Sequence, residues 1–106
     1  MLKYIFLLLF CCASGFSQSI HDFAKNGDLQ AIQALDIEDQ EVFNLQNENG
    51  YSPLMLAAYY NKTDIILYLL KYGADVNAKD FRGNKALDYA ILKQNETIIK
   101  LLNTYK

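Results

Sequence analysis

The sequence predicts an all-α solenoid of about three stacked helix-turn-helix units, of which the first is degenerate. Two observations support this fold class: an internal repeat of 33 residues, and apolar residues spaced three and four apart between polar turns. Superposing Gly50 on Gly83 brings similar residues together: Leu54 onto Leu87, Ala57 onto Ala90 and Tyr72 onto Tyr105. The domain is expected to cover residues 18–106, with units at about 18–46, 47–79 and 80–106.

Residues 1–17 have the features of a signal peptide. Lys3 supplies a positive charge, Tyr4 to Cys12 form a short apolar core, and small residues follow at Gly15 and Ser17. The apolar run is about half of the roughly twenty residues that span a bilayer, which favours cleavage after Ser17 over a permanent anchor. We therefore expect an exported protein, periplasmic or secreted and bacterial in character, with no membrane attachment once the leader is removed.

The second unit shows most clearly where the expected helices begin and end. Ser52 can accept a hydrogen bond from a free N–H of the first turn, and Pro53 suits the first helical position. Ala57 and Ala58 fall on the inward face, where small side chains let a neighbouring helix approach closely. Asn61 can adopt the left-handed conformation that ends a helix.

A second helix is predicted over residues 63–72 and is expected to end at Gly73. Its inward residues are expected to be Ile65, Ile66, Leu69 and Leu70. In the first unit, Ser19 can begin a helix that turns Ile20, Phe23 and Ala24 inward. In the last helix, a polar outer side is expected from Thr97, Lys100, Asn103, Thr104 and Lys106.

The segment GYSPLMLAAYYNKTDIILYLLKYGADVNAKDFRG, residues 50–83, resembles an ankyrin repeat. The pattern of that family runs G-x-T-P-L-H-x-A-A, a polar turn, an apolar helix, and L-L-x-x-G-A-D-V-N. The resemblance is strong in the middle unit, fair in the last and weak in the first. In the last unit Lys85, Ala86 and Gln94 replace the capping threonine, the proline and the turn glycine, so the first helix there is less sharply defined at both ends.

The resemblance also implies where a partner protein would bind. In ankyrin repeats, the hairpin tips and the end of the first helix contact partners, and this places Tyr59 and Tyr60 on the inner, concave side. The implied partner-binding residues are Glu48, Asn49, Tyr51, Tyr59, Tyr60, Phe81, Arg82, Asn84, Leu92 and Lys93. Tyrosine, phenylalanine and arginine are enriched at interfaces. The alternative is that Tyr60 or Phe81 packs beneath the neighbouring turn.

The sequence offers few candidates for catalysis, metal binding or a cofactor. Both cysteines, Cys11 and Cys12, lie in the expected leader, and the single histidine, His21, falls where ankyrin repeats usually have a histidine with a structural hydrogen-bonding role. The acidic residues Asp36, Glu38, Asp39 and Glu41 lack the glycine of a calcium loop and are expected to form a solvated loop. We therefore expect no enzyme activity, no catalytic residue, no metal and no cofactor.

Charge and fold together indicate a protein that binds another protein. The net charge is −2 and the ten basic residues are scattered, which excludes a nucleic-acid partner. The sequence favours a monomeric, non-catalytic interaction module that uses its concave face and hairpin tips. Two alternatives stay open: an inhibitor or immunity factor for an exported enzyme, and a structural envelope component that self-associates.

Overall fold

The computed structural model describes residues 19–35 and 40–105, and within these ranges the regular structure is entirely helical. The elements are α2 (Ile20–Asn26), α3 (Leu29–Ala34), the short 3-10 helix η1 (Gln40–Asn44), α4 (Pro53–Tyr59), α5 (Thr63–Lys71), α6 (Ala86–Leu92) and α7 (Glu96–Thr104). The expected signal peptide lies outside the described residues. No helix within them is both long enough and apolar enough to cross a membrane.

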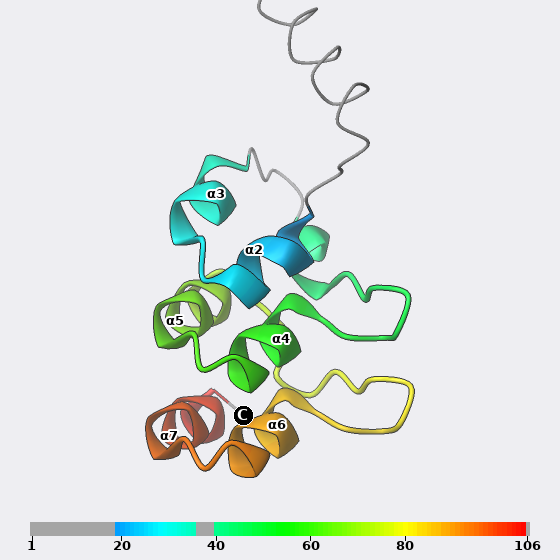
Figure 1. Ribbon diagram of the computed structural model, residues 1–106, viewed down its shortest axis with the longest axis vertical. Helices are drawn as coiled ribbons and strands as arrows, with labels where there is room; N and C mark the ends of the chain where they lie inside the picture. The colour runs from blue at the N-terminus through cyan, green and yellow to red at the C-terminus, as the bar shows by residue number, and fades with distance from the viewer. Residues whose placement is uncertain (1–18, 36–39, 106) are drawn as a thin grey trace, which may run out of the picture.

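The helices form two rows in a stack, as Figure 1 shows. One row contains α2, α4 and α6, the other contains α3, α5 and α7, and the loops between units project from the side of the α2–α4–α6 row (Figure 1). The all-α stack of helix pairs predicted from the 33-residue period is confirmed. The helix predicted over residues 63–72 ends one residue earlier, at Lys71.

In each unit, the side chain at the third position of the first helix helps to close the helix start. The Ser52 hydroxyl accepts a hydrogen bond from the Met55 N–H at 3.2 Å, as predicted. Met55 sulfur in turn accepts from the Ser52 N–H at 3.4 Å. Asp22 and Asp88 occupy the same third position in the other units.

These two aspartates explain how helices begin without the residues of the family pattern. The Asp88 carboxylate accepts the Lys85 N–H at 2.8 Å, and the Asp22 carboxylate accepts the Ser19 N–H at 3.1 Å. The expectation that His21 occupies this position is wrong, because the helix begins after Ser19 and so places Asp22 there. His21 lies one residue earlier, and the structural hydrogen-bonding role expected of it is confirmed, because its Nε2 lies 2.6 Å from the Leu45 carbonyl oxygen.

The first helix of each unit is followed by a residue in the left-handed conformation. Gly27 has φ +76°, Asn61 has φ +60° and Gln94 has φ +57°. The prediction for Asn61 is confirmed. Gln94 takes the same conformation although it carries a Cβ, and the adjacent Asn95 donates a side-chain hydrogen bond to Asn61 at 3.2 Å. This bond joins the turns of consecutive units.

The core is a continuous apolar layer between the two rows of helices. Ala24, Ala57, Ala58 and Ala90 have no exposed surface, which lets α2, α4 and α6 approach one another closely. The branched side chains predicted to point inward are all buried: Ile65, Ile66, Leu69 and Leu70.

Of the residues expected inward in α2, Ile20 and Ala24 are buried and Phe23 packs against the core. Along α7 the predicted polar side is exposed at Thr97, Lys100, Asn103 and Thr104, whereas Lys106 lies outside the described residues.

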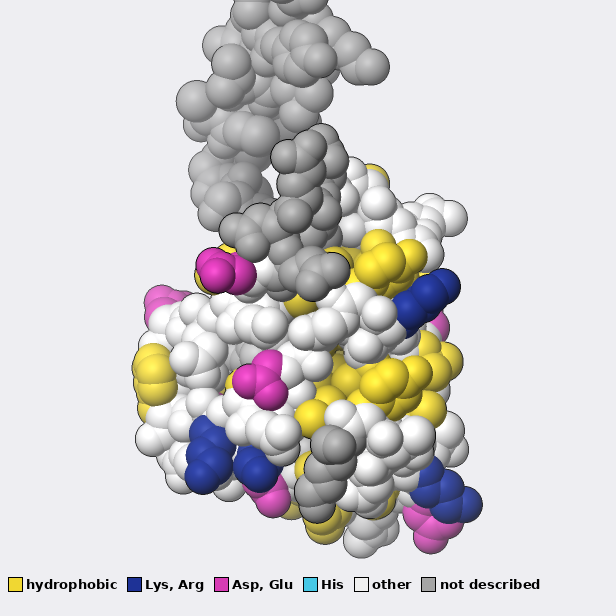
Figure 2. Space-filling view, turned by 180° about the vertical axis from the view of Figure 1, so that it is seen from behind, with side chains coloured by type: hydrophobic (Ala, Val, Ile, Leu, Met, Phe, Trp, Pro, Cys, Tyr) yellow, Lys and Arg dark blue, Asp and Glu magenta, His cyan; other side chains and the backbone are white. Residues whose placement is uncertain are grey.

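A group of aromatic residues lies on the outer side of the stack. The buried ring of Phe43 meets Tyr68 edge-to-face, with 6.1 Å between centroids, and Tyr68 and Tyr72 lie 4.6 Å apart. Leu67 of α5 and Tyr72, which follows α5, are exposed. Figure 2, seen from behind, shows hydrophobic side chains gathered on this side of the molecule.

The stack predicts a loss of cooperativity when the third unit is removed. A chain truncated after Asn77 exposes the apolar face of α4 and α5 that α6 and α7 cover, and two units bury too little surface for stable stacking. We expect no cooperative transition when this truncated chain is heated and followed by circular dichroism. The full chain is the control, and a sharp transition in the truncated chain would contradict the stacking argument.

Candidate partner-binding groove

The loop at residues 47–51 forms a tight hairpin tip around one asparagine. The Asn47 side-chain oxygen accepts hydrogen bonds from the N–H groups of Asn49 at 3.0 Å and Tyr51 at 2.9 Å. The Gly50 N–H bonds to the Asn47 carbonyl at 2.9 Å, and Gly50 has φ +84°, a conformation that favours glycine. The tip therefore holds Tyr51 in a fixed place beside the start of α4.

The next tip, residues 80–84, repeats this arrangement with an aspartate. Asp80 Oδ1 accepts the N–H groups of Arg82 and Asn84, both at 2.9 Å. The Gly83 N–H bonds to the Asp80 carbonyl at 3.0 Å, and Gly83 has φ +85°. The two tips are thus equivalent turns, one repeat period apart.

The two tips pack directly on each other. Gln46 Nε2 donates to the Gly50 carbonyl at 3.0 Å and to the Lys79 carbonyl at 2.7 Å, which joins one tip to the next. The Phe81 side chain lies against Gly50, where a Cβ would come within 2.7 Å of the ring. The tips therefore depend on the stacking of the units and hold one another in place.

Asp80 also fixes a tyrosine of the third unit. Its Oδ2 accepts a hydrogen bond from the Tyr89 hydroxyl, and the aspartate is buried. Burial by itself would raise the pKa of Asp80, but the hydrogen bonds from Tyr89, Asn84 and Arg82, with the charge of Arg82, outweigh burial and lower that pKa. Burial, followed by the hydrogen bond to Asp80, raises the pKa of Tyr89 to about 12. At neutral pH the pair is therefore a carboxylate and a neutral phenol.

Four tyrosine rings from the first tip, α4 and α6 form a row. Tyr51 meets Tyr89 edge-to-face with centroids 6.0 Å apart, Tyr89 meets Tyr59 at 6.1 Å, and Tyr59 meets Tyr60 at 5.0 Å. Edge-to-face contacts of this kind are favourable beyond simple burial. The rings thus hold one another in orientation while Tyr59 and Tyr60 stay 36% and 39% exposed.

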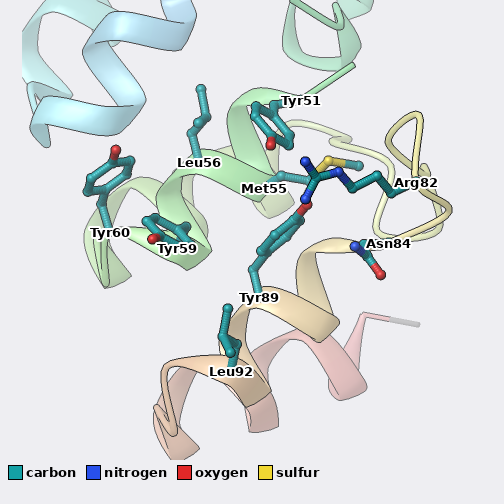
Figure 3. A pocket seen from close by; sticks show the side chains of 9 residues that line it. All are labelled: Tyr51, Met55, Leu56, Tyr59, Tyr60, Arg82, Asn84, Tyr89 and Leu92. Atoms are coloured by element: carbon teal, nitrogen blue, oxygen red, sulfur yellow. The ribbon is translucent and has the colours of Figure 1, made fainter. Parts of the chain in front are cut away.

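Basic side chains lie beside this row. The Lys93 ammonium lies 4.3 Å from the centroid of the Tyr59 ring, and the Lys25 ammonium lies 5.5 Å from that of Tyr60. Arg82 lies at the other end, on the side of Tyr51 and Tyr89 (Figure 3).

These side chains border a groove of about 460 Å³ between α4, α6 and the tips. Its lining residues are Tyr51, Met55, Leu56, Tyr59, Tyr60, Arg82, Asn84, Tyr89 and Leu92. In Figure 3 the Tyr89 side chain extends from α6 toward Met55 and Arg82, Leu92 points from α6 toward α4, and Leu56 points away from α6. The groove therefore joins side chains from two successive repeats.

The structure brings most of the predicted partner-binding residues to this groove. The lining includes Tyr51, Tyr59, Tyr60, Arg82, Asn84 and Leu92, and Lys93 lies over one of its rings. Glu48, Asn49 and Phe81 are exposed on the tips. Tyr60 is 39% exposed, and Phe81 contacts Gly50 of the neighbouring tip, as the alternative expected, while staying 73% exposed. Partner contact by these residues stays a prediction.

Sequence reasoning missed three lining residues: Met55, Leu56 and Tyr89. Helical spacing could have found them. Met55 and Leu56 lie four and three residues before Tyr59, and Tyr89 lies three residues before Leu92, so each shares a face with a residue that was predicted. Of the predicted acidic loop, only Glu41 lies among the described residues, which contain no metal-binding cluster of histidine, cysteine or carboxylate side chains.

Comparison with known proteins agrees with this geometry. A family model described as ankyrin repeats, in three copies, matches residues 20–106. The chain belongs to the ankyrin-repeat family. Ankyrin repeats are protein-interaction modules, and the groove joins two of them. Residues outside the ankyrin-repeat match, 1–19, include the expected signal peptide, which the family match does not address.

Individual ankyrin-repeat relatives are similar over much of this chain. Human inversin is 38% identical over 97 residues, which cover 92% of this chain and 9% of inversin. The IkB-like protein of the Malawi Lil 20-1/1983 isolate of African swine fever virus is 41% identical over 82 residues, which cover 74% of this chain and 34% of the viral protein. The chain thus spans a small part of the relatives that it matches.

The contact between tips can be tested with two equivalent glycines. Both Gly50→Ala and Gly83→Ala put a Cβ on a left-handed residue, which costs roughly 1–2 kcal/mol. Only the Cβ at position 50 also meets the Phe81 ring and backbone, whereas the one at position 83 meets nothing within 4 Å. We expect Gly50→Ala to lower the free energy of unfolding by about 1–3 kcal/mol more than Gly83→Ala in urea denaturation. Equal losses would show that the tips do not pack as described.

The Asp80–Tyr89 pair predicts a pH dependence of stability. Because the pKa of Asp80 is lowered in the folded state, its charge stabilises the fold above the unfolded pKa of about 3.9, and this stability is lost as pH falls through the lower, folded pKa. Asp80→Asn keeps the turn acceptor, as Asn47 does, but removes the charge. We expect the loss of unfolding free energy on acidification to be largest in the wild type, smaller in Tyr89→Phe and smallest in Asp80→Asn. Identical acid profiles for all three would contradict the role given to the carboxylate.

Proposed function

We propose that this chain is a non-catalytic module that binds another protein through the groove and the hairpin tips. The observation that carries the proposal is the row of four tyrosine rings, which hold one another edge-to-face while two of them stay partly exposed. Rings already ordered before binding lose little side-chain entropy when a partner covers them. Tyrosine and arginine, which line this groove, are the residue types that most often dominate binding energy.

The chemistry of the groove supports binding without catalysis. Among the described residues, the groove lining contains no carboxylate, histidine or thiol that could act as a base or a nucleophile. The nearby Asp80 carboxylate already accepts three hydrogen bonds, from the Tyr89 hydroxyl and two backbone N–H groups. Its position accounts for the shape of the tip and the orientation of Tyr89.

We also propose that the module acts after export, in the periplasm or outside the cell. This proposal rests on the sequence of residues 1–17, with its basic start, short apolar core and small residues before Gln18. The folded unit begins at Ile20, so cleavage after Ser17 would leave the first helix and its cap intact.

Removal of the two exposed rings tests the proposed surface. We expect Tyr59→Ala combined with Tyr60→Ala to weaken binding of the native partner by about 2 kcal/mol or more, because central aromatic anchors dominate such interfaces. Helix content is expected to stay the same, since both rings lie at the end of α4 outside the core. Binding is measured by calorimetry with the partner captured from an extract of the native organism.

The matched control removes two exposed side chains from the outer side of the stack. Leu67 and Tyr72 are 46% and 40% exposed, comparable with Tyr59 and Tyr60. Leu67→Ala combined with Tyr72→Ala is expected to leave partner affinity unchanged. If the outer-side variant loses affinity and the groove variant keeps it, the partner binds elsewhere and the proposed surface is wrong.

A further inference from the structure

We propose that the groove binds an acidic segment of the partner, in which carboxylates flank one large apolar side chain that enters the groove. This inference rests on the proposed function, because it gives the chemistry of the partner at the same surface. It is carried by the position of three cations around a lining that is otherwise uncharged.

The middle of the groove is suited to an apolar side chain. Met55 is buried beneath it, so the accessible apolar surface comes from the half-buried Leu56 on α4 and the largely exposed Leu92 on α6. The volume of about 460 Å³ falls within the range of pockets that bind ligands, about 300–1,000 Å³. Covering Leu92 and the faces of the tyrosine rings removes apolar surface from water, which favours binding.

The ends of the groove are suited to negative charge. Arg82 lies at the end formed by Tyr51 and Tyr89, and within residues 19–35 and 40–105 it is the only charged residue that lines the groove (Figure 3). Lys25 and Lys93 lie at the opposite end, over the rings of Tyr60 and Tyr59. All three side chains are exposed and can pair with an incoming carboxylate.

The positive charge of this surface does not follow from the composition of the chain. The whole sequence carries a net charge of −2, yet the cations come from three places, α2, the second tip and the end of α6, and meet at one groove. Complementary charge steers a partner toward such a surface and rejects partners of the same sign. Cations at both ends and apolar side chains between them specify an acidic–apolar–acidic order.

Carboxylates of this chain also lie on this side of the molecule, among them Asp80 on the second tip and Glu48 on the first. Asp80 is directed at the Tyr89 hydroxyl and at backbone N–H groups, and its charge is also stabilised by that of Arg82, whose side chain stays exposed. Glu48 is exposed on the neighbouring tip, outside the groove lining. Neither one separates the three cations from the groove.

Selection from a random library of twelve-residue displayed peptides tests this chemistry. With the full chain as target, we expect enrichment of peptides that carry Asp or Glu on both sides of a large apolar residue. In a parallel selection against Arg82→Glu combined with Lys93→Glu, we expect Lys or Arg at those positions instead. Affinity of the first peptides, measured by fluorescence polarisation, is expected to fall at least about tenfold for this variant, a change of about 1.4 kcal/mol. The affinity of the wild type for the first peptides is also expected to fall as the salt concentration is raised.

The control reverses two charges on the outer helices. Lys71→Glu combined with Lys100→Glu makes the same change in net charge away from the groove, and it is expected to bind the acidic peptides as the wild type does. Thermal melting establishes that both charge variants are folded. Enrichment of neutral or basic peptides by the wild type, or enrichment of none, would overturn the inference.

Failure of this inference can be told apart from failure of the proposed function. If the Tyr59/Tyr60 double alanine variant loses the native partner while the Arg82/Lys93 charge reversal keeps it, the groove binds the partner but the acidic chemistry is wrong. If neither change affects the native partner, both proposals are wrong.

Discussion

The close approach of the inner helices is the constraint on which the rest of the structure depends. Ala24, Ala57, Ala58 and Ala90 have no exposed surface, so α2, α4 and α6 meet through their smallest side chains. Larger residues such as Ile65 and Ile98 then fill the space toward the outer helices. One helix pair has apolar residues on both sides and cannot bury them alone, which is why the units are stable only as a stack.

Stacking of the units also determines how the hairpin tips pack on each other. Because each unit repeats the last at a constant interval, the Gln46 side chain reaches the carbonyl of Lys79, 33 residues away, and Phe81 lies against Gly50. Two short turns that would otherwise be exposed loops become a paired structure. The groove needs this pairing, since Tyr51 belongs to one tip and Arg82 to the next.

Local substitutions are tolerated where another group supplies the same bond. In the third unit, the Lys85 side chain cannot accept the Asp88 N–H as the Ser52 hydroxyl accepts that of Met55, and the Lys85 carbonyl accepts it instead at 3.0 Å. The Asp88 carboxylate in turn accepts the Lys85 N–H, as Met55 sulfur accepts that of Ser52. Similarly, Asp80 replaces Asn47 in the turn and uses its second oxygen to bind Tyr89, which stands where the preceding unit has Leu56. These two differences between the repeats let the turn aspartate support a tyrosine of the groove.

The sequence by itself determined the fold class, the repeat period and the inward residues, because these follow from the spacing of apolar side chains. It also determined the helix ends near Ser52 and Asn61, because these follow from local conformation. It also indicated Tyr59 and Tyr60, but not Met55, Leu56 and Tyr89 as their neighbours. The position of His21 was one residue wrong, since spacing alone could not show that Asp22 closes the helix start. Only the tertiary structure decided that rings and cations from three units meet at one groove, because their distances depend on how the units stack rather than on their order along the chain.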